Sequence, residues 1–270
     1  CCEFTETDAL NNMSTDLSGN KQSKLLPLTG AQRNVWYHQL IDPASVAYNI
    51  GQIIRIHGQL SNELFIRAQN LVWNASESLR IRIVVAQGEP FQEILPPGEA
   101  PFEQSDLRSA EDIEQVLKAA IENHQLRPFD LNNGPCCRFA LFQIADNKWV
   151  WSMAVHHLAV DAPGGSYLTT LLAQTYKNLD TPEVDFDVIT PHEWAQAIEN
   201  DHDYQSSERY RKDKEYWLQA TDGLVTPPSF SIQPINTLNL AVPKNTFHSI
   251  PRDEYEKFAN WSISNGQSLY

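Results

Sequence analysis

Cysteine is scarce in this sequence of 270 residues, and its placement argues against two common structural roles. The four cysteines form two adjacent pairs, Cys1-Cys2 and Cys136-Cys137. Adjacent cysteines suit neither a disulfide framework nor the ligand spacing of a zinc site. We therefore expect reduced thiols in a cytoplasmic protein, with Cys136 and Cys137 at the start of a strand.

Basic residues are also few, with 20 Lys and Arg against 34 Asp and Glu and a net charge of −14. This balance argues against a nucleic-acid partner, because phosphate binding needs a basic footprint. No segment approaches the roughly 18 apolar residues of a membrane-spanning helix, and the N-terminus lacks a signal-peptide pattern. The sequence has neither a GxGxxG pattern nor a Walker loop, so nucleotide binding is unsupported.

Two adjacent histidines connect a segment typical of a buried strand to one typical of a helix. His156 and His157 follow residues 148–155, and the helical pattern runs over 166–176. Imidazoles exchange protons near neutral pH. Because successive side chains on a strand point to opposite faces, we expect His156 to pack and His157 to face an open channel. A metal site built from these histidines and Asp161 is disfavoured, because this geometry separates the imidazoles.

Asp161, in the connecting loop, allows three interpretations. It orients an imidazole, pairs with an arginine that holds the loop, or caps the following helix. Arg80 and Arg82 lie two apart in a segment, 79–85, that is typical of a strand, so they should share one face. On a buried face they need a carboxylate partner; on a solvent face they need none.

Several segments follow motifs of one protein family. Residues 156–162 (HHLAVDA) are similar to HHxxxDG, residues 26–32 (LPLTGAQ) with Val35-Trp36 to an LPLT–AQ opening, and residues 76–83 (SESLRIRI) to HExLRTRF. Residues 129–135 (FDLNNGP) are similar to FDLxxGP, and residues 210–217 to a later helix that ends in Tyr-Trp. The set, in this order over about residues 25 to 218, resembles the condensation domains of nonribosomal peptide synthetases. Ala162 stands where that family has glycine, although Gly164 and Gly165 follow closely.

The resemblance implies an α/β fold, a two-layer sandwich of the chloramphenicol acetyltransferase-like type. It implies a largely complete N-terminal lobe over 25–225 and a truncated C-terminal lobe, with a crossing segment and first elements over 226–270. Residues 1–24 are polar and lack periodicity, so we expect a disordered leader. With half a channel, the chain alone should fold its first lobe, self-associate or need a partner segment, and show negligible condensation.

The resemblance also implies an activity, in which an acyltransferase forms an amide bond between a carrier-bound acyl or peptidyl thioester and a carrier-bound aminoacyl group. His157 would deprotonate or position the amine, while His156 and Asp161 hold the loop, with Arg80 favoured over Arg82 as the ion-pair partner of Asp161. Ala162 and Gly164 would support the same loop. The implied partners are donor and acceptor carrier proteins and adjacent synthetase domains. The resemblance implies no cofactor bound directly to this chain, only the phosphopantetheine arms of the carriers.

Two other functions remain open at this point. The HHxxxD pattern also occurs in acyltransferases that esterify a free alcohol. A degenerate domain could instead only bind a carrier protein, as Ala162 and the missing later motifs of the family suggest. The LPLT opening and the FDLxxGP pattern favour the peptide synthetase branch.

Overall fold

The computed structural model describes residues 25–181, 194–223 and 250–267. The chain forms two compact units, Cys1–Phe230 and Ser231–Tyr270. The predicted leader over 1–24, most of the acidic segment 180–187, and the predicted crossing segment as far as residue 249 lie outside the described residues.

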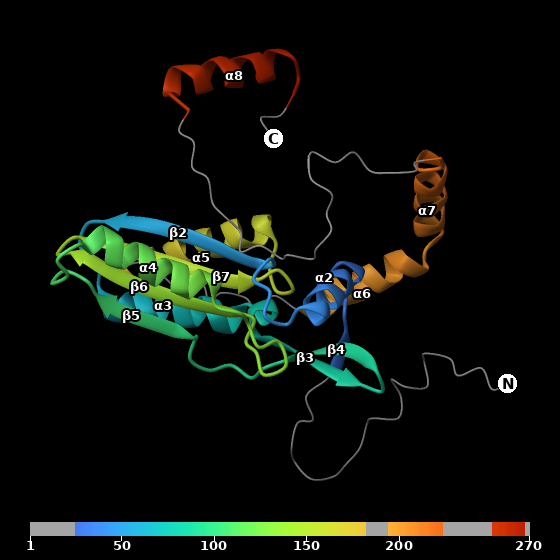
Figure 1. Ribbon diagram of the computed structural model, residues 1–270, viewed down its shortest axis with the longest axis horizontal. Helices are drawn as coiled ribbons and strands as arrows, with labels where there is room; N and C mark the ends of the chain where they lie inside the picture. The colour runs from blue at the N-terminus through green and yellow to red at the C-terminus, as the bar shows by residue number, and fades with distance from the viewer. Residues whose placement is uncertain (1–24, 182–193, 224–249, 268–270) are drawn as a thin grey trace, which may run out of the picture. The chain divides into compact units, whose positions relative to one another are not determined.

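A four-stranded sheet, with strand order β2-β7-β6-β5, forms the centre of the first unit (Figure 1). Three strands are antiparallel, and only the β5–β6 pair is parallel. The register places Asn49 opposite His156 at one end of the β2–β7 pair and His57 opposite Lys148 at the other. The strands are β2 (Asn49–His57), β5 (Phe102–Asp106), β6 (Cys137–Ala145) and β7 (Lys148–His156).

Helices cover both faces of this sheet, as strand alternation requires when both faces are apolar. Helices α3 (Asn62–Ala75) and α5 (Ala162–Asp180) pack side by side on one face, where Phe65 and Leu168 join a core that includes Phe139. Helix α4 (Ile113–Leu126) covers the other face through Leu117, which packs with Phe142 and Val150. The α/β prediction is confirmed.

A smaller sheet, with strand order β1-β4-β3, lies beside the first (Figure 1). Its strands are β1 (Leu25–Pro27), β3 (Ile81–Ala86) and β4 (Glu89–Ile94). The strand expected over 79–85 begins two residues late, because Glu77–Arg80 form the 3-10 turn η1. Arg80 therefore does not share a strand face with Arg82. The segment 96–109, which contains three prolines, includes β5, which pairs with the distant β6.

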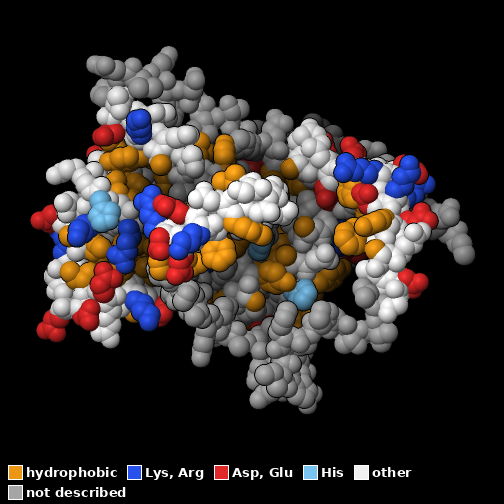
Figure 2. All heavy atoms as spheres, turned by 90° about the horizontal axis from the view of Figure 1, so that it is seen from above, with side chains coloured by type: hydrophobic (Ala, Val, Ile, Leu, Met, Phe, Trp, Pro, Cys, Tyr) orange, Lys and Arg blue, Asp and Glu red, His pale blue; other side chains and the backbone are white. Residues whose placement is uncertain are grey.

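The remaining helices of the first unit are α2 (Gly30–Ile41), α6 (Trp194–Ser206) and α7 (Glu208–Ala220). Thr29 and Gln32 form a capping box at the start of α2. None of the residues of α7 is buried, and Tyr216 and Trp217 are exposed on it. Figure 2 shows acidic and basic side chains lying among one another on one face, with hydrophobic side chains between them.

The described part of the second unit contains one helix, α8 (Arg252–Ser264), which begins after Pro251. Its exposed side chains include Phe258 and Trp261. No helix in the described ranges combines the length and apolar character needed to cross a membrane.

Candidate active site

The two adjacent histidines occupy opposite environments, as strand alternation predicts. His156 is the last residue of β7, and only 1% of it is exposed. His157 lies just beyond the strand, where its N–H donates to the carbonyl of Tyr48 at 2.9 Å. Between Trp149 and Val160, His157 is the one exposed residue. The fold therefore turns a single imidazole of the pair outward.

The buried imidazole of His156 is fixed at both nitrogens. Its Nδ1 accepts the N–H of Leu158 at 3.2 Å, so its Nε2 carries the proton and donates to Oε1 of Gln39 at 3.2 Å. Burial and, to a smaller extent, the neighbouring His157 together lower the pKa of His156 to about 4. His156 is therefore neutral at physiological pH and holds the turn that presents His157.

Gln39 completes this arrangement and was not predicted from the sequence. Its amide nitrogen donates to three carbonyls at 3.0–3.2 Å, which orients its oxygen toward His156; the acceptors belong to Asp42, Pro43 and Ser45. One signal could have revealed it. Gln32, Trp36 and Gln39 recur at i, i+4 and i+7, the spacing of the buried face of a helix.

A second buried amide network supports the loop after His157. Nε2 of Gln32 donates to the carbonyl of Leu158 at 2.9 Å, and its amide pairs with that of Gln92. Gln92 also accepts Nε1–H of Trp194 at 2.7 Å. The LPLTGAQ segment therefore holds the HHLAVDA segment through a hydrogen bond between residues 126 positions apart.

The FDLNNGP segment contacts His156, the buried histidine of the pair. The ring of Phe129 meets His156 edge-on, with centroids 6.2 Å apart, and the guanidinium of Arg138 lies 4.0 Å from the centroid of Phe129. Gly134 has φ +58°, and a Cβ there would come within 2.9 Å of Cβ of Arg82. Any residue with a Cβ at position 134 would be strained by the positive φ and would crowd Arg82.

His157 faces a hollow of about 390 Å³. Helix α2 contributes Gln32, and the start of α5 contributes Gly164. The turn η1 and its cap Ser76 also line the hollow, as does Trp194 of α6. In the described part of the chain, the imidazole of His157 makes no side-chain hydrogen bond, so both its nitrogens remain open to a ligand.

Asp161 caps helix α5 and does not pair with an arginine. Its Oδ1 accepts the N–H of Gly164 at 2.8 Å, and the residue is exposed. A Cβ on Gly164 would lie 3.0 Å from that oxygen, so the cap favours glycine there. Ala162 is the first residue of α5 and has no positive φ, so its conformation does not require the family's glycine.

The predicted ion pair of Asp161 with Arg80 or Arg82 is wrong. Arg80 is buried in η1, and its guanidinium donates to the carbonyls of Leu95 and Asn74. Burial lowers the pKa of Arg80, and Glu77 partly offsets this effect. Arg82 instead pairs with Glu93, its direct neighbour across the β3–β4 ladder, at 2.6 Å.

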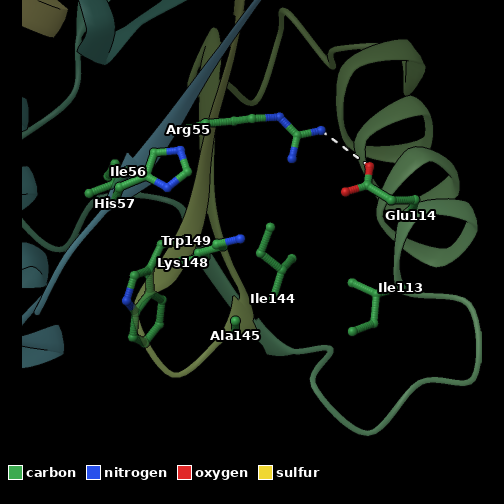
Figure 3. A pocket seen from close by; sticks show the side chains of 9 residues that line it. All are labelled: Arg55, Ile56, His57, Ile113, Glu114, Ile144, Ala145, Lys148 and Trp149. Atoms are coloured by element: carbon green, nitrogen blue, oxygen red, sulfur yellow. Dashed lines mark hydrogen bonds and ion pairs between the residues drawn. The ribbon is translucent and has the colours of Figure 1, made fainter.

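Another hollow, of about 340 Å³, lies at the opposite end of the β2–β7 pair (Figure 3). Arg55, His57 and Lys148 contribute basic groups to its lining, and Arg55 forms an exposed ion pair with Glu114 at 3.2 Å. Ile113 and Ile144 add apolar surface. Over the residues that the structure describes, no three His, Cys, Asp or Glu side chains gather to hold a metal ion in either hollow.

Comparisons with known proteins identify the family of this chain. The condensation-domain family matches residues 22–237. A dimodular nonribosomal peptide synthase of Bacillus subtilis is 32% identical over 71% of this chain, and an isonitrile lipopeptide synthase of Streptomyces coeruleorubidus is 30% identical over 82%. The matched regions are 8% and 15% of those synthases.

A solved structure extends the comparison to the fold. A variant of the starter condensation domain of rhizomide synthetase superposes with a TM-score of 0.69 and 27% identity, covering 77% of this chain and 48% of that one. The chain thus spans about half of this solved domain. It belongs to the condensation-domain family of nonribosomal peptide synthetases.

Proposed function

We propose that His157 is the catalytic residue of an amide-forming acyl transfer between two carrier-bound thioesters. The amine nitrogen of the acceptor attacks the thioester carbonyl of the donor, so a C–N bond forms and the C–S bond breaks. His157 takes the proton that the amine must lose and returns it to the departing thiolate. The observation that carries this proposal is that His157 alone is exposed between Trp149 and Val160 and lines the hollow.

The surrounding residues support this role by limiting the positions of His157. Its backbone is held by Tyr48, and the adjacent turn is held by the neutral His156 and by Gln32. A group that is positioned before the reaction contributes more than a mobile one. The hollow of about 390 Å³ also falls in the usual size range of small-molecule sites, roughly 300–1,000 Å³.

The partners in this proposal are a donor and an acceptor carrier protein, whose phosphopantetheine arms deliver the thioesters in the cytoplasm. Adjacent synthetase domains would supply the loaded carriers. No residue of this chain is assigned to a bound cofactor. The relatives that support these partners are synthases much longer than the matched region.

The test is the substitution His157→Ala in the full-length natural protein, assayed with loaded donor and acceptor carriers by mass spectrometry of the product. We expect product formation to fall at least about 100-fold, the lower end of general-base effects, with unchanged carrier affinity. His57→Ala is the matched control, since His57 is an exposed histidine at the other end of the same strand pair. Activity of His157→Ala within about threefold of wild type would remove His157 from the mechanism.

A further inference from the structure

The hollow beside His157 is acidic. Among its described lining residues, the charged side chains are Glu77 and Asp161, and no lysine or arginine is present. The oxygen Oδ1 of Asp161 is already engaged in capping α5. Glu77 lies in the turn η1, which approaches the hollow from a different part of the chain.

One oxygen of the Glu77 carboxylate is fixed by a hydrogen bond. Its Oε2 accepts the backbone N–H of Trp194 at 2.9 Å, which links η1 to α6. Within the described ranges, the other oxygen has no hydrogen-bond donor from the protein. The half-buried side chain therefore offers a positioned anionic acceptor to a ligand in the hollow.

Ser76, the residue before it, supplies an independent observation. It lines the hollow, and only 5% of it is exposed. Its hydroxyl finds no partner within the described ranges, although Ser76 occupies the cap position of η1, where a serine side chain often bonds the backbone. A buried hydroxyl without a partner is unfavourable, so a bound ligand that completes its hydrogen bonding would be stabilised there.

We infer that Glu77, with Ser76, forms the subsite that receives the acceptor's primary amine in its protonated form. This inference rests on the proposed function and deepens it. An α-amino group has a pKa of about 7.7–8.0, so most of it is an ammonium ion at neutral pH, which a carboxylate attracts and a hydroxyl can help to bind. Two protons must leave the bound ammonium. One is released to solvent to give the free amine, and His157 takes the second as the amine attacks the thioester and returns it to the departing thiolate.

The acidic lining also discriminates between acceptors. A neutral alcohol gains no charge attraction from Glu77, whereas an ammonium ion does. The subsite therefore favours amide formation over the esterification of an alcohol. Glu77 and Ser76 act here as specificity-determining residues, and proton transfer remains with His157.

The experiment compares Glu77→Gln with wild type in the full-length protein, using aminoacyl-loaded acceptor carrier and the matching hydroxyacyl-loaded carrier as probes. Glutamine keeps an oxygen for the N–H of Trp194 and removes only the charge. We expect KM for the aminoacyl acceptor to rise at least about tenfold, kcat to change less than about threefold, and the preference for amine over alcohol to fall by a similar factor. Donor KM should not change. Glu114→Gln, a carboxylate in the hollow of Figure 3, is the matched control and should alter none of these values.

Ser76→Ala adds a readout that a purely structural role would not give. Because this hydroxyl has no partner in the described structure, its removal should leave the unfolding temperature unchanged or higher, while raising the acceptor KM. An unchanged acceptor KM and amine preference in Glu77→Gln, with wild-type unfolding temperature, would overturn the inference. If that result accompanied a large loss in His157→Ala, the inference alone would fail and the proposed function would stand.

Discussion

The two ends of the β2–β7 pair carry hollows of similar size and opposite character. The hollow beside His157 has a volume of about 390 Å³, carboxylates as its charged lining, and a frame of buried amides. The hollow beside His57 has a volume of about 340 Å³, basic side chains, and an exposed ion pair between Arg55 and Glu114 (Figure 3). Each hollow presents one exposed histidine.

The difference between these ends supports the proposal that His157, and not His57, is the catalytic histidine. His57 lies on an edge strand of the sheet, and a solvent-screened ion pair restrains the groups around it weakly. His157 projects from a turn whose backbone is held by the carbonyl of Tyr48 and by the buried side chains of His156 and Gln32. A buried network restricts geometry more strongly, because breaking it leaves polar groups unsatisfied.

The largest expected effect comes from removing the buried amide at the His157 end. Gln39→Leu leaves the Nε2–H of His156 and the carbonyls of the 42–45 turn without their partner, so the free energy of unfolding should fall by roughly 3–5 kcal/mol. Arg55→Ala at the other end should cost at most about 1 kcal/mol. Urea unfolding monitored by tryptophan fluorescence measures both. Equal losses for the two variants would contradict the contrast between the ends.

Acid should destabilise the His157 end through its buried imidazole. Burial lowers the pKa of His156 to about 4 from an ordinary value of 6.5, and burial with the nearby Arg138 does the same to His124. Between about pH 4 and pH 6.5, the unfolded chain binds more protons than the folded chain. The stability contributed by each neutral imidazole is therefore complete above about pH 6.5, and it is lost as the pH falls toward 4.

This loss should reach roughly 2 kcal/mol per histidine at pH 5. His156→Gln, which retains a donor for Gln39, removes one of the two titrating groups and should flatten the pH dependence of the unfolding free energy between pH 7 and 5. His57→Gln is the control at the opposite end. An identical slope in wild type and His156→Gln would show that His156 does not titrate on unfolding.

The smallest expected loss of stability is at Asp161, where two substitutions distinguish a helix cap from a buried ion pair. Asp161→Ala should cost about 1 kcal/mol, and Asp161→Asn should cost nearly nothing, because asparagine also caps helices. A buried ion pair would instead lose roughly 3–5 kcal/mol with either substitution. Thermal unfolding of the three proteins distinguishes these outcomes, and a large loss in Asp161→Asn would restore the ion pair.

Local patterns in the sequence were sufficient for much of this fold and for the division of the histidines. The strand before the two histidines and the helix after them followed from their apolar patterns. The opposite placement of His156 and His157 followed from strand alternation. The family resemblance identified the segments that surround them, and the comparisons confirmed the family.

Features that depend on distant contacts could not be predicted in this way. Strand β5 lies in a proline-rich segment and is a strand only because β6 pairs with it. The prediction placed Arg80 in the strand, because an apolar run does not show that its first residues form a turn. The hydrogen-bond partners of Arg80 are carbonyl groups that no sequence pattern marks. Gln39 and Gln92 contact residues 117 and 60 positions away, so their roles depend on the assembled fold.

The central claim is that the two adjacent histidines have separate tasks, chemistry for His157 and support for His156. The most direct measurement is the single-turnover rate of product formation from loaded carriers, alongside the thermal unfolding midpoint, for His157→Gln and His156→Gln in the full-length protein. We predict that His157→Gln loses at least about 100-fold in rate with its midpoint within about 2 °C of wild type. His156→Gln should lower the midpoint and reduce the rate far less. A His157→Gln protein that retains its rate within about threefold, while His156→Gln loses it at an unchanged midpoint, would contradict the account.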